Sequence, residues 1–297
     1  MELHDLVGPI DTLSSNWPDQ PQVYQHTPDT FRDLLTLHEI DELIDSNCLA
    51  ARNVVLLRKE DGGVVESHEY TDGDMPRPGT VREHLDRGGS ISLRLLHTLY
   101  PRLAILKNNV QGATLCRAHV NAYLTPGRQQ GLRYHYDPYV TLIVQLHGRK
   151  TWPLHKPMVE RPTEEHENFR LRGWTDEEHK FLATTPPAQS VTLEPGNVFW
   201  LPRGWIHAPY AVSEEPSLHI TVALKERTLS WLVEHLAEII VRHARADFDA
   251  RQVLAPADLL ADPNEALEWT RKYMIGALIG LDLEATMASA LNKARTT

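Results

Sequence analysis

The sequence predicts a mainly β fold in which a β-rich segment, from about Ala118 to Lys225, lies between helical regions. Within this segment, short apolar runs are separated by Gly and Pro turns, whereas apolar residues outside it recur at helical spacing. A chain of 297 residues can hold one large domain with a small appendage. We expect a domain over residues 1–225, with its core at about 118–225, and a helical C-terminal region over residues 226–297.

The elements before the β-rich segment are mixed. Residues Thr30–Ser46 carry leucine and isoleucine at helical spacing, and Asn53–Lys59 (NVVLLRK) is typical of a strand. The stretch Thr80–Leu103 predicts a helix that stops near Gly88–Gly89 and a second helix that ends at Pro101. After Lys225, apolar residues between Leu229 and Ile240 recur at the i, i+3, i+4 and i+7 positions of an amphipathic helix.

Three runs of the β-rich segment alternate polar and aliphatic residues. They are Asn121–Thr125, Tyr139–Leu146 and Ser217–Leu224. Alternate side chains of a strand point to opposite faces, so each run has an aliphatic face and a face of hydrogen-bonding groups. An antiparallel sheet with its polar side in water explains this pattern. A barrel whose polar interior forms a ligand pocket explains it equally well.

Composition excludes several classes of protein. The formal net charge of −10 argues against a general binder of nucleic acid or anionic membranes. The two cysteines, Cys48 and Cys116, are too few and too far apart for a disulfide scaffold. The N-terminal sequence MELHDLVGPID has acids where a signal peptide needs basic and then apolar residues. No apolar run reaches the roughly 18 residues of a membrane span. We therefore expect a cytoplasmic location.

His135 and Asp137 are candidate metal ligands. They precede the strand Tyr139–Leu146, and residues two apart on an extended segment share a face with Cα atoms about 6.5–7 Å apart. An imidazole and a carboxylate at this separation can converge on one ion, although a solvated loop pair is the alternative. A second His-x-Asp pair, His84 and Asp86, lies in a predicted helix, where residues two apart point in different directions.

His207 is a candidate for the third ligand. It follows the turn Pro202–Gly204 in the stretch Glu194–Pro209 (EPGNVFWLPRGWIHAP) and begins a new predicted strand. Beside Trp205 it could also be an ordinary core histidine. Two histidines and one carboxylate form a facial triad, which leaves three metal positions open and is typical of non-haem Fe(II) oxygenases.

The residues from about Asn121 to Leu224 resemble the JmjC-type cupins of the ribosomal-oxygenase group. The resemblance is carried by NAYLTPGRQQGLRYHYDPYVTLIVQLHGRKTW, LEPGNVFWLPRGWIHAP and SLHITVAL. It implies a double-stranded β-helix, the jelly-roll core of cupins, with Fe(II) held by His135, Asp137 and His207. It also implies 2-oxoglutarate as co-substrate with O2, and a C-terminal helical region that serves in dimerisation. The helix at Leu229–Ile240 could instead pack on its own barrel.

The resemblance also implies roles in co-substrate binding. Lys150 is expected to pair with the distal carboxylate of 2-oxoglutarate, and Asn121, Tyr123 and His219 match positions that line the same pocket. A desolvated carboxylate needs a cation or strong donors, which fits a lysine. The alternation of side chains between the two faces of a strand does not continue across the turn Gly148–Arg149. The spacing alone therefore allows two alternatives: Arg149 binds the carboxylate instead, or Lys150 is an exposed lysine of the hairpin.

The implied activity is hydroxylation of a C–H bond with release of succinate and CO2, the substrate being a ribosomal or other polypeptide residue. No catalytic residue is expected beyond the metal centre. Three alternatives stay open: a hydroxylase of a small molecule or peptide natural product, a demethylase, and a non-catalytic metal-binding cupin. The segment His155–Ser190 is long for a link between strands and rich in acids. It could be a lid for a basic or peptide substrate or a solvated loop.

Overall fold

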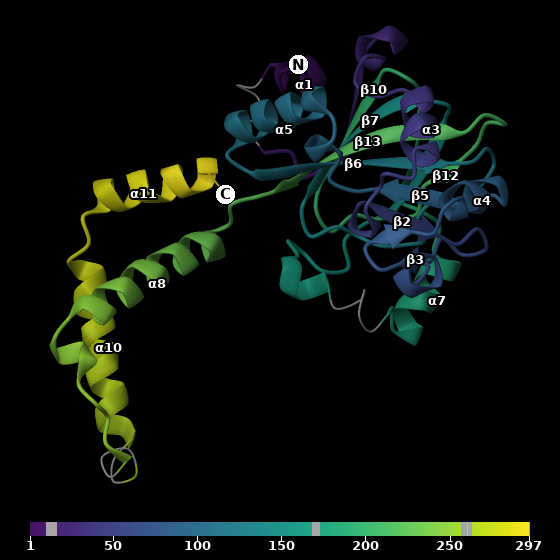
Figure 1. Ribbon diagram of the computed structural model, residues 1–297. Coiled ribbons are helices and arrows are strands. Elements are labelled where there is room, and N and C mark those ends of the chain that lie inside the picture. The colour runs from purple at the N-terminus through teal and green to yellow at the C-terminus, as the bar shows by residue number, and fades with distance from the viewer. Residues whose placement is uncertain (10–16, 168–172, 257–259, 261–262, 297) are drawn as a thin grey trace. The chain divides into compact units, whose positions relative to one another are not determined.

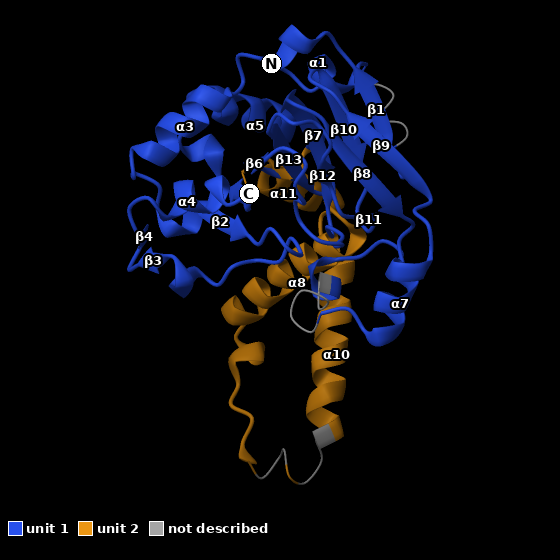
Figure 2. Ribbon diagram, turned by 90° about the vertical axis from the view of Figure 1, so that its right-hand side faces the viewer, with its two compact units in different colours: residues 1–114, 118–225 blue, residues 115–117, 226–297 orange. Residues whose placement is uncertain are grey.

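The computed structural model describes residues 1–9, 17–167, 173–256, 260 and 263–296. The chain divides into two compact units (Figure 2): unit 1 holds residues 1–114 and 118–225, and unit 2 holds residues 115–117 and 226–297.

Unit 1 is built on two antiparallel sheets and a small hairpin (Figure 1). The large sheet has the order β1 (Gln22–Gln25), β10 (Asn197–Leu201), β7 (Val140–His147), β13 (Ser217–Lys225), β6 (Arg117–Thr125), β5 (Ser90–Leu93) and β2 (Val54–Leu57). The small sheet joins β11 (Ile206–His207), β8 (Lys150–His155), β12 (Tyr210–Ala211) and β9 (Gln189–Leu193). The hairpin pairs β3 (Thr71–Asp72) with β4 (Met75–Pro76).

Both faces of β7 and β13 are buried except at the last residues of each strand, and the polar face of β6 is half-buried. Leu142, Val144 and Ile220 on the aliphatic face are 0% exposed. On the polar face, Gln145 is 0% and His219 2% exposed, and neither side chain reaches solvent. A sheet with one wet face would leave these polar groups hydrated, so the polar face is the interior of a barrel. The predicted jelly-roll core with flanking helices is confirmed.

Helices cover unit 1 on the side of the large sheet opposite β8 and β9 (Figure 2). They are α1 (His4–Val7), α3 (Leu37–Asp45), α4 (Thr80–Asp86) and α5 (Pro101–Thr114), while α7 (Asp176–Thr184) lies in the link between β8 and β9. Short 3₁₀ turns occur at Pro28–Phe31, Ala51–Asn53, Ser67–Glu69, Leu96–Thr98 and Glu164–Glu167.

The prediction for residues after Gly89 is wrong. Ser90–Leu93 forms strand β5, between β6 and β2, with every residue buried, and a helix begins at Pro101 instead of ending there. Proline suits the first turn of a helix because the N–H that it lacks has no partner inside the helix. The helix predicted over Thr30–Ser46 is also shorter, since α3 begins at Leu37.

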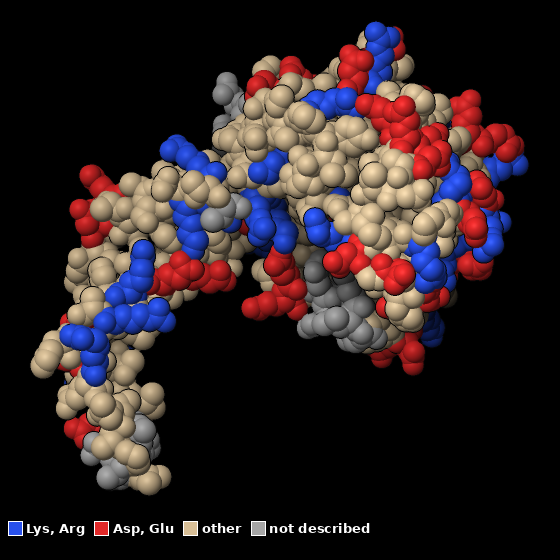
Figure 3. All heavy atoms as spheres, in the orientation of Figure 1, with Lys and Arg blue, Asp and Glu red and all other residues tan. Residues whose placement is uncertain are grey.

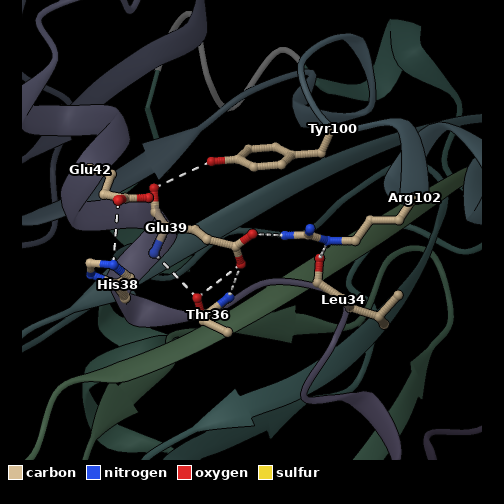
Figure 4. Close-up of polar contacts among 7 residues, drawn as sticks. All are labelled: Leu34, Thr36, His38, Glu39, Glu42, Tyr100 and Arg102. Carbon is tan, nitrogen blue, oxygen red and sulfur yellow. Dashed lines mark hydrogen bonds and ion pairs between the residues drawn. The ribbon is translucent and has the colours of Figure 1, made fainter.

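A polar cluster joins α3 to the start of α5 (Figure 4). Thr36 caps α3 through a capping box with Glu39, the Thr36 Oγ1 accepting the Glu39 N–H at 3.2 Å. Glu39 also forms an ion pair with Arg102, and the Arg102 Nε donates to the Leu34 carbonyl at 2.6 Å. The capping box satisfies backbone N–H groups that the first turn of a helix leaves without partners, and Arg102 ties this turn to α5. A residue at the N-cap thus contributes about 1 kcal/mol to stability.

Unit 2 consists of α8 (Leu229–Ala246), α10 (Pro263–Ile279) and α11 (Leu283–Thr296), with a 3₁₀ turn at Asp249–Arg251. The Lys293 Nζ of α11 lies 2.6 Å from the Glu238 carboxylate of α8. No single helix in the described ranges is long and apolar enough to cross a membrane. Helices α10 and α11 reach that criterion only when taken together, and a 90° bend separates them.

Candidate metal centre

The two segments that carry the candidate ligands run side by side as an antiparallel pair. The His135 N–H donates to the His207 carbonyl at 3.1 Å, and the His207 N–H donates back to the His135 carbonyl at 2.8 Å. Further along, the Gly131 N–H donates to the Pro209 carbonyl at 2.9 Å. Residues directly opposite each other in an antiparallel pair place their side chains on the same face. This pairing therefore brings the two imidazoles together.

The side chains of His135, Asp137 and His207 form a cluster with metal-ligand geometry. One ligand atom from each lies within 4.8 Å of the other two. Across the described ranges, no other group of three or more His, Cys, Asp or Glu side chains meets this criterion. The centroids of the two imidazole rings are 4.2 Å apart. Three ligands on one side of an ion correspond to a facial triad with open positions opposite them.

The backbone fixes the tautomer of both imidazoles. The Nδ1 atom of His135 lies 2.8 Å from the Arg133 carbonyl oxygen, and that of His207 lies 2.9 Å from the Trp205 carbonyl oxygen. A carbonyl only accepts hydrogen bonds, so each Nδ1 carries the hydrogen and each Nε2 carries the lone pair. Such outer hydrogen bonds are typical of histidines that bind metals. The chemistry of the donor set therefore fits a divalent metal ion.

Thr141 of β7 orients the carboxylate of the cluster, because its Oγ1–H donates to the Asp137 Oδ2 at 3.3 Å. We expect Thr141→Val to weaken Mn(II) or Co(II) binding by roughly 10-fold, since loss of an outer hydrogen bond costs 10- to 100-fold in affinity. Titration followed by calorimetry measures the change. Thr192→Val is the matched control, as it removes a threonine hydrogen bond to Thr151 on β8 outside the cavity. Equal losses in both variants would contradict the role of Thr141.

Lys150 points into the same cavity. The residue is 1% exposed, and its Nζ donates to the Thr125 Oγ1 at 2.7 Å. Burial lowers the pKa of Lys150 to about 7. Arg149, the rival in the sequence, lies on the surface, with 52% of its side chain exposed and its guanidinium 3.8 Å from the Glu194 carboxylate. A buried amine beside a neutral hydroxyl is a ready partner for an incoming carboxylate.

The cavity has further polar groups available for a ligand. Tyr123 and His219 stack at 5.0 Å between centroids, and both line the cavity. Burial, together with the charges of Lys150 and His207, holds the pKa of His219 well below its usual value. The buried Nδ1 of His219 has no hydrogen-bond partner among the described residues. A buried polar atom without a partner indicates that a ligand or water completes the site.

Asn121 differs from the other predicted co-substrate residues. Its Oδ1 accepts the backbone N–H of Leu95 at 3.0 Å. It is not among the residues that line the cavity.

Thr125, Thr141 and Thr221 also line the cavity. They lie on the polar strand faces that strand parity predicts from the sequence, although no individual role was predicted for them. Nothing in the sequence indicated that Gly131 lines the cavity. A Cβ on Gly131 would lie 2.7 Å from the Pro209 carbonyl oxygen and 3.3 Å from the Lys150 Nζ. A side chain there would fill the space beside the amine. The rest of the lining is Leu57, Leu132, Trp152 and Pro209.

Comparison with known proteins defines the class. Residues 98–232 match the profile of the family described as the JmjC domain. The chain is 29% identical over 248 residues to a Drosophila persimilis protein named bifunctional lysine-specific demethylase and histidyl-hydroxylase NO66, covering 82% of this chain and 34% of that protein. A Dictyostelium discoideum protein of the same name is 36% identical over 149 residues, 49% of this chain and 27% of that protein. The chain thus spans about a third of the length of the curated relatives that it matches.

Solved structures share the fold of the chain. Escherichia coli YcfD matches with a TM-score of 0.56 and 17% identity, over 92% of this chain and 68% of that chain. A structure described as YcfD, a ribosomal oxygenase from Escherichia coli, in complex with cobalt and succinic acid gives a TM-score of 0.55 and 18% identity, over 92% and 67% of the two chains. At this identity they show a shared fold. Residues 98–232 of this chain therefore form a JmjC domain, and the chain shares the fold of these structures.

Proposed function

We propose that this protein is an Fe(II)- and 2-oxoglutarate-dependent oxygenase that hydroxylates a C–H bond of a polypeptide residue, with release of succinate and CO2. The observation that carries the proposal is the presence, in one cavity, of the triad His135, Asp137 and His207 together with the buried Lys150. The relatives named as histidyl-hydroxylases and the structure described as a ribosomal oxygenase support a polypeptide substrate. A ribosomal protein is our first candidate.

The residues would divide the work as follows. The two imidazole Nε2 atoms and the Asp137 carboxylate would hold the metal, and Lys150 would bind the distal carboxylate of 2-oxoglutarate. Barrel walls of Trp152 and Leu57 would keep water from the reacting groups. When bound, the metal and 2-oxoglutarate supply the oxidising chemistry with O2, while the protein supplies open coordination and orientation. We assign no proton transfer to a side chain.

A non-catalytic metal-binding cupin is the alternative from another class. The position of Lys150 disfavours it, because burying an amine costs free energy and a structural metal site has no use for a cation in its cavity. Anaerobic addition of Fe(II) and 2-oxoglutarate separates the two functions. A visible charge-transfer band is expected for the oxygenase, and its absence would count against it. A hydroxylase of a small molecule or peptide natural product would give the same band.

The pKa of Lys150 predicts how co-substrate binding depends on pH. In the free protein this pKa is about 7, and a bound carboxylate raises it, so above pH 7 binding takes up a proton. We expect the affinity for 2-oxoglutarate to fall as pH rises above 7, by up to about 10-fold per unit. Calorimetry at pH 8 in buffers of different ionisation enthalpy measures the uptake. Little uptake is expected at pH 6, and a pH-independent affinity in metal-loaded protein would contradict the assignment.

The substrate can be tested directly by intact-mass spectrometry of ribosomal proteins from the source organism with and without the gene. One protein should be lighter by one oxygen atom in the deletion strain. Wild type should restore the mass, whereas His135→Ala should not. Unchanged masses for all ribosomal proteins would refute this substrate class and turn the search to modified peptides and metabolites. Loss of a methyl group instead of gain of oxygen would indicate demethylation.

The surface charge bears on the kind of polypeptide. Acidic and basic side chains are interspersed on the face in Figure 3, within an overall net charge of −10. The link between β8 and β9 exposes Glu164, Glu165, Asp176 and Glu177. An acidic segment favours encounter with a basic protein, as many ribosomal proteins are.

Unit 2 supports self-association. On α10, Leu267, Ile275 and Leu278 are at least 42% exposed and recur at helical spacing. On α11, which follows α10 after the 90° bend, Leu283 and Met287 are 77% and 49% exposed. Exposed apolar side chains in such number mark an interface, and we propose that two copies pair through α10 and α11. Sedimentation should give a dimer for wild type and a monomer for Leu278→Lys. A monomeric wild type would refute the pairing.

A further inference from the structure

The link between β8 and β9, residues 156–188, packs on the outer side of the segments that carry the candidate metal ligands. We call this link the strap, and the structure describes its residues 156–167 and 173–188. Its main helix is α7, which lies next to the sheet edge formed by β11 (Figure 2). The strap therefore lies on the side of the ligand-bearing segments that faces away from the cavity.

Residues that face the strap alternate with those that face the cavity. Tyr136, which lies between two candidate ligands, is 3% exposed, and Ile206, which precedes the third, is 0% exposed. Both belong to an apolar cluster with Leu182 of α7, and Tyr134 and Trp174 pack against this cluster. Because strand side chains alternate between faces, the position of these residues determines that of the ligands beside them.

Hydrogen bonds add to this packing. The Trp174 Nε1–H donates to the Tyr134 carbonyl at 3.0 Å, on the residue before the first ligand. The Tyr136 hydroxyl donates to the His166 carbonyl of the strap. Glu164 of the strap forms an ion pair with Lys225 at the end of β13. The strap is therefore bonded both to the backbone and to a side chain of the segment that carries two ligands.

The strap also contacts the turn that precedes the third ligand. Gly204 has a φ of +85°, and a Cβ there would lie 3.0 Å from the Pro162 Cδ and 3.2 Å from the Pro157 Cβ. The Arg203 Nη1 donates to the Pro162 carbonyl at 3.4 Å. Glycine is needed here both for the left-handed backbone and for the close approach of the strap. Both metal-bearing segments thus lie against the strap.

These contacts matter because the pairing of the two segments is short. β11 has only two residues, and His135 pairs with it through an isolated bridge. So short a ladder is marginally stable without a packed face. Metal ligands must be held within about 0.5 Å of their productive positions to bind well. Packing by the strap supplies that restraint from outside the barrel.

From this geometry we infer that the strap preorganises the metal centre, with Trp174 as a positioning residue that acts through the Tyr134 backbone. The inference rests on the proposed metal site. It predicts that loosening the strap lowers metal affinity even though no strap residue contacts the metal, and that metal binding in turn stabilises the strap, because such coupling is reciprocal.

The test is Co(II) affinity of the full chain, followed by visible absorption. Trp174→Phe keeps an aromatic ring, although a smaller one, removes the N–H donor, and is expected to weaken binding about 10-fold. Thr175→Ala removes the capping box of α7, in which the Thr175 Oγ1 accepts the Glu178 N–H at 3.2 Å, and should act in the same direction. Thr36→Ala is the matched control, because it removes the same motif from α3.

The outcomes separate the two proposals. Weaker binding in both strap variants, with wild-type affinity in Thr36→Ala, supports the inference. Equal affinity in all four proteins would overturn the role of the strap and leave the metal site intact. A wild type that bound no Co(II) would instead refute the site itself. A loss in Thr36→Ala as large as in the strap variants would reduce the effect to general stability and overturn the inference.

Hydrogen exchange of the unaltered protein gives an independent readout. Saturating Co(II) should slow exchange of the α7 amides, Asp176–Thr184, and leave those of α3, Leu37–Asp45, unchanged. This comparison needs no variant, so it stands even if Trp174→Phe does not fold. Unchanged exchange in α7 in the Co(II)-loaded protein would overturn the coupling.

Discussion

An Asp137→Ala protein is expected to lose metal binding and hydroxylation while it stays folded. The carboxylate is the only anionic ligand of the cluster, and its removal leaves two neutral imidazoles to hold a divalent ion. We expect the dissociation constant for Mn(II) or Co(II) to rise more than about 100-fold, beyond what loss of an outer-shell partner costs. Turnover, measured as succinate formation with Fe(II) and 2-oxoglutarate, should fall to background.

The chain offers a matched control in its second His-x-Asp pair. Asp86 lies at the end of α4 and is exposed, and Asp86→Ala removes the same charge without touching the cavity. It should keep wild-type metal affinity. Unfolding curves of both variants check that a loss of binding does not reflect a loss of fold. Wild-type affinity for Mn(II) or Co(II) in Asp137→Ala would refute the proposed triad.

Lys150→Met is expected to weaken 2-oxoglutarate binding at least about 30-fold, since leaving one partner of a buried charge pair alone costs about 2–5 kcal/mol. Metal affinity should be unaffected, because Lys150 is not a member of the ligand cluster. Calorimetry with Mn(II)-loaded protein measures both. Arg149→Met is the control: it removes a neighbouring cation whose side chain is 52% exposed, and it should bind 2-oxoglutarate normally.

Lys150→Met should also be more stable than wild type in the absence of ligand, because methionine removes the free-energy cost of burying an amine. The pKa of Lys150 is about 7 in the folded protein, against 10.5 as its ordinary value. Below pH 7 the Lys150 amine is charged in both the folded and the unfolded protein, and burying it lowers the free energy of unfolding most. As pH rises from 7, the folded state loses the proton first, so wild type gains stability by about 1.4 kcal/mol per unit.

The advantage of Lys150→Met in thermal unfolding should therefore shrink between pH 6 and pH 9. Higher stability with lost co-substrate affinity is the signature of a functional lysine. A variant that is less stable than wild type and still binds 2-oxoglutarate would show that Lys150 has a structural role instead.

The local alternation of residues was enough to predict much of the barrel. The polar and aliphatic faces of β6, β7 and β13 follow directly from the sequence, as do the turns that bound β10. The shared face of His135 and Asp137 is of the same kind. These features depend on residues two to four apart, whose geometry the extended backbone fixes without help from the rest of the chain.

Where local patterns were ambiguous, the prediction failed or stayed open. The sequence predicts a helix over the residues of β5, because the alternation of serine with Ile91 and Leu93 spans only four residues, too few to distinguish a strand from a helix. Arg149 and Lys150 could not be separated, because the turn at Gly148 breaks the parity of the strands that it joins. Pairing of Lys150 with Leu193 and Ala211 in the small sheet decides which side chain points inward.

The sequence by itself determined the class of the protein, the barrel strands and the candidate ligands. The tertiary structure decided how they meet: the bridge between His135 and His207, the burial of the polar faces, the inward position of Lys150, and the strap behind the ligands. The reason is physical. Alternation and turns are set by neighbouring residues, whereas register between distant segments is set by hydrogen bonds and burial that form only when the whole barrel closes.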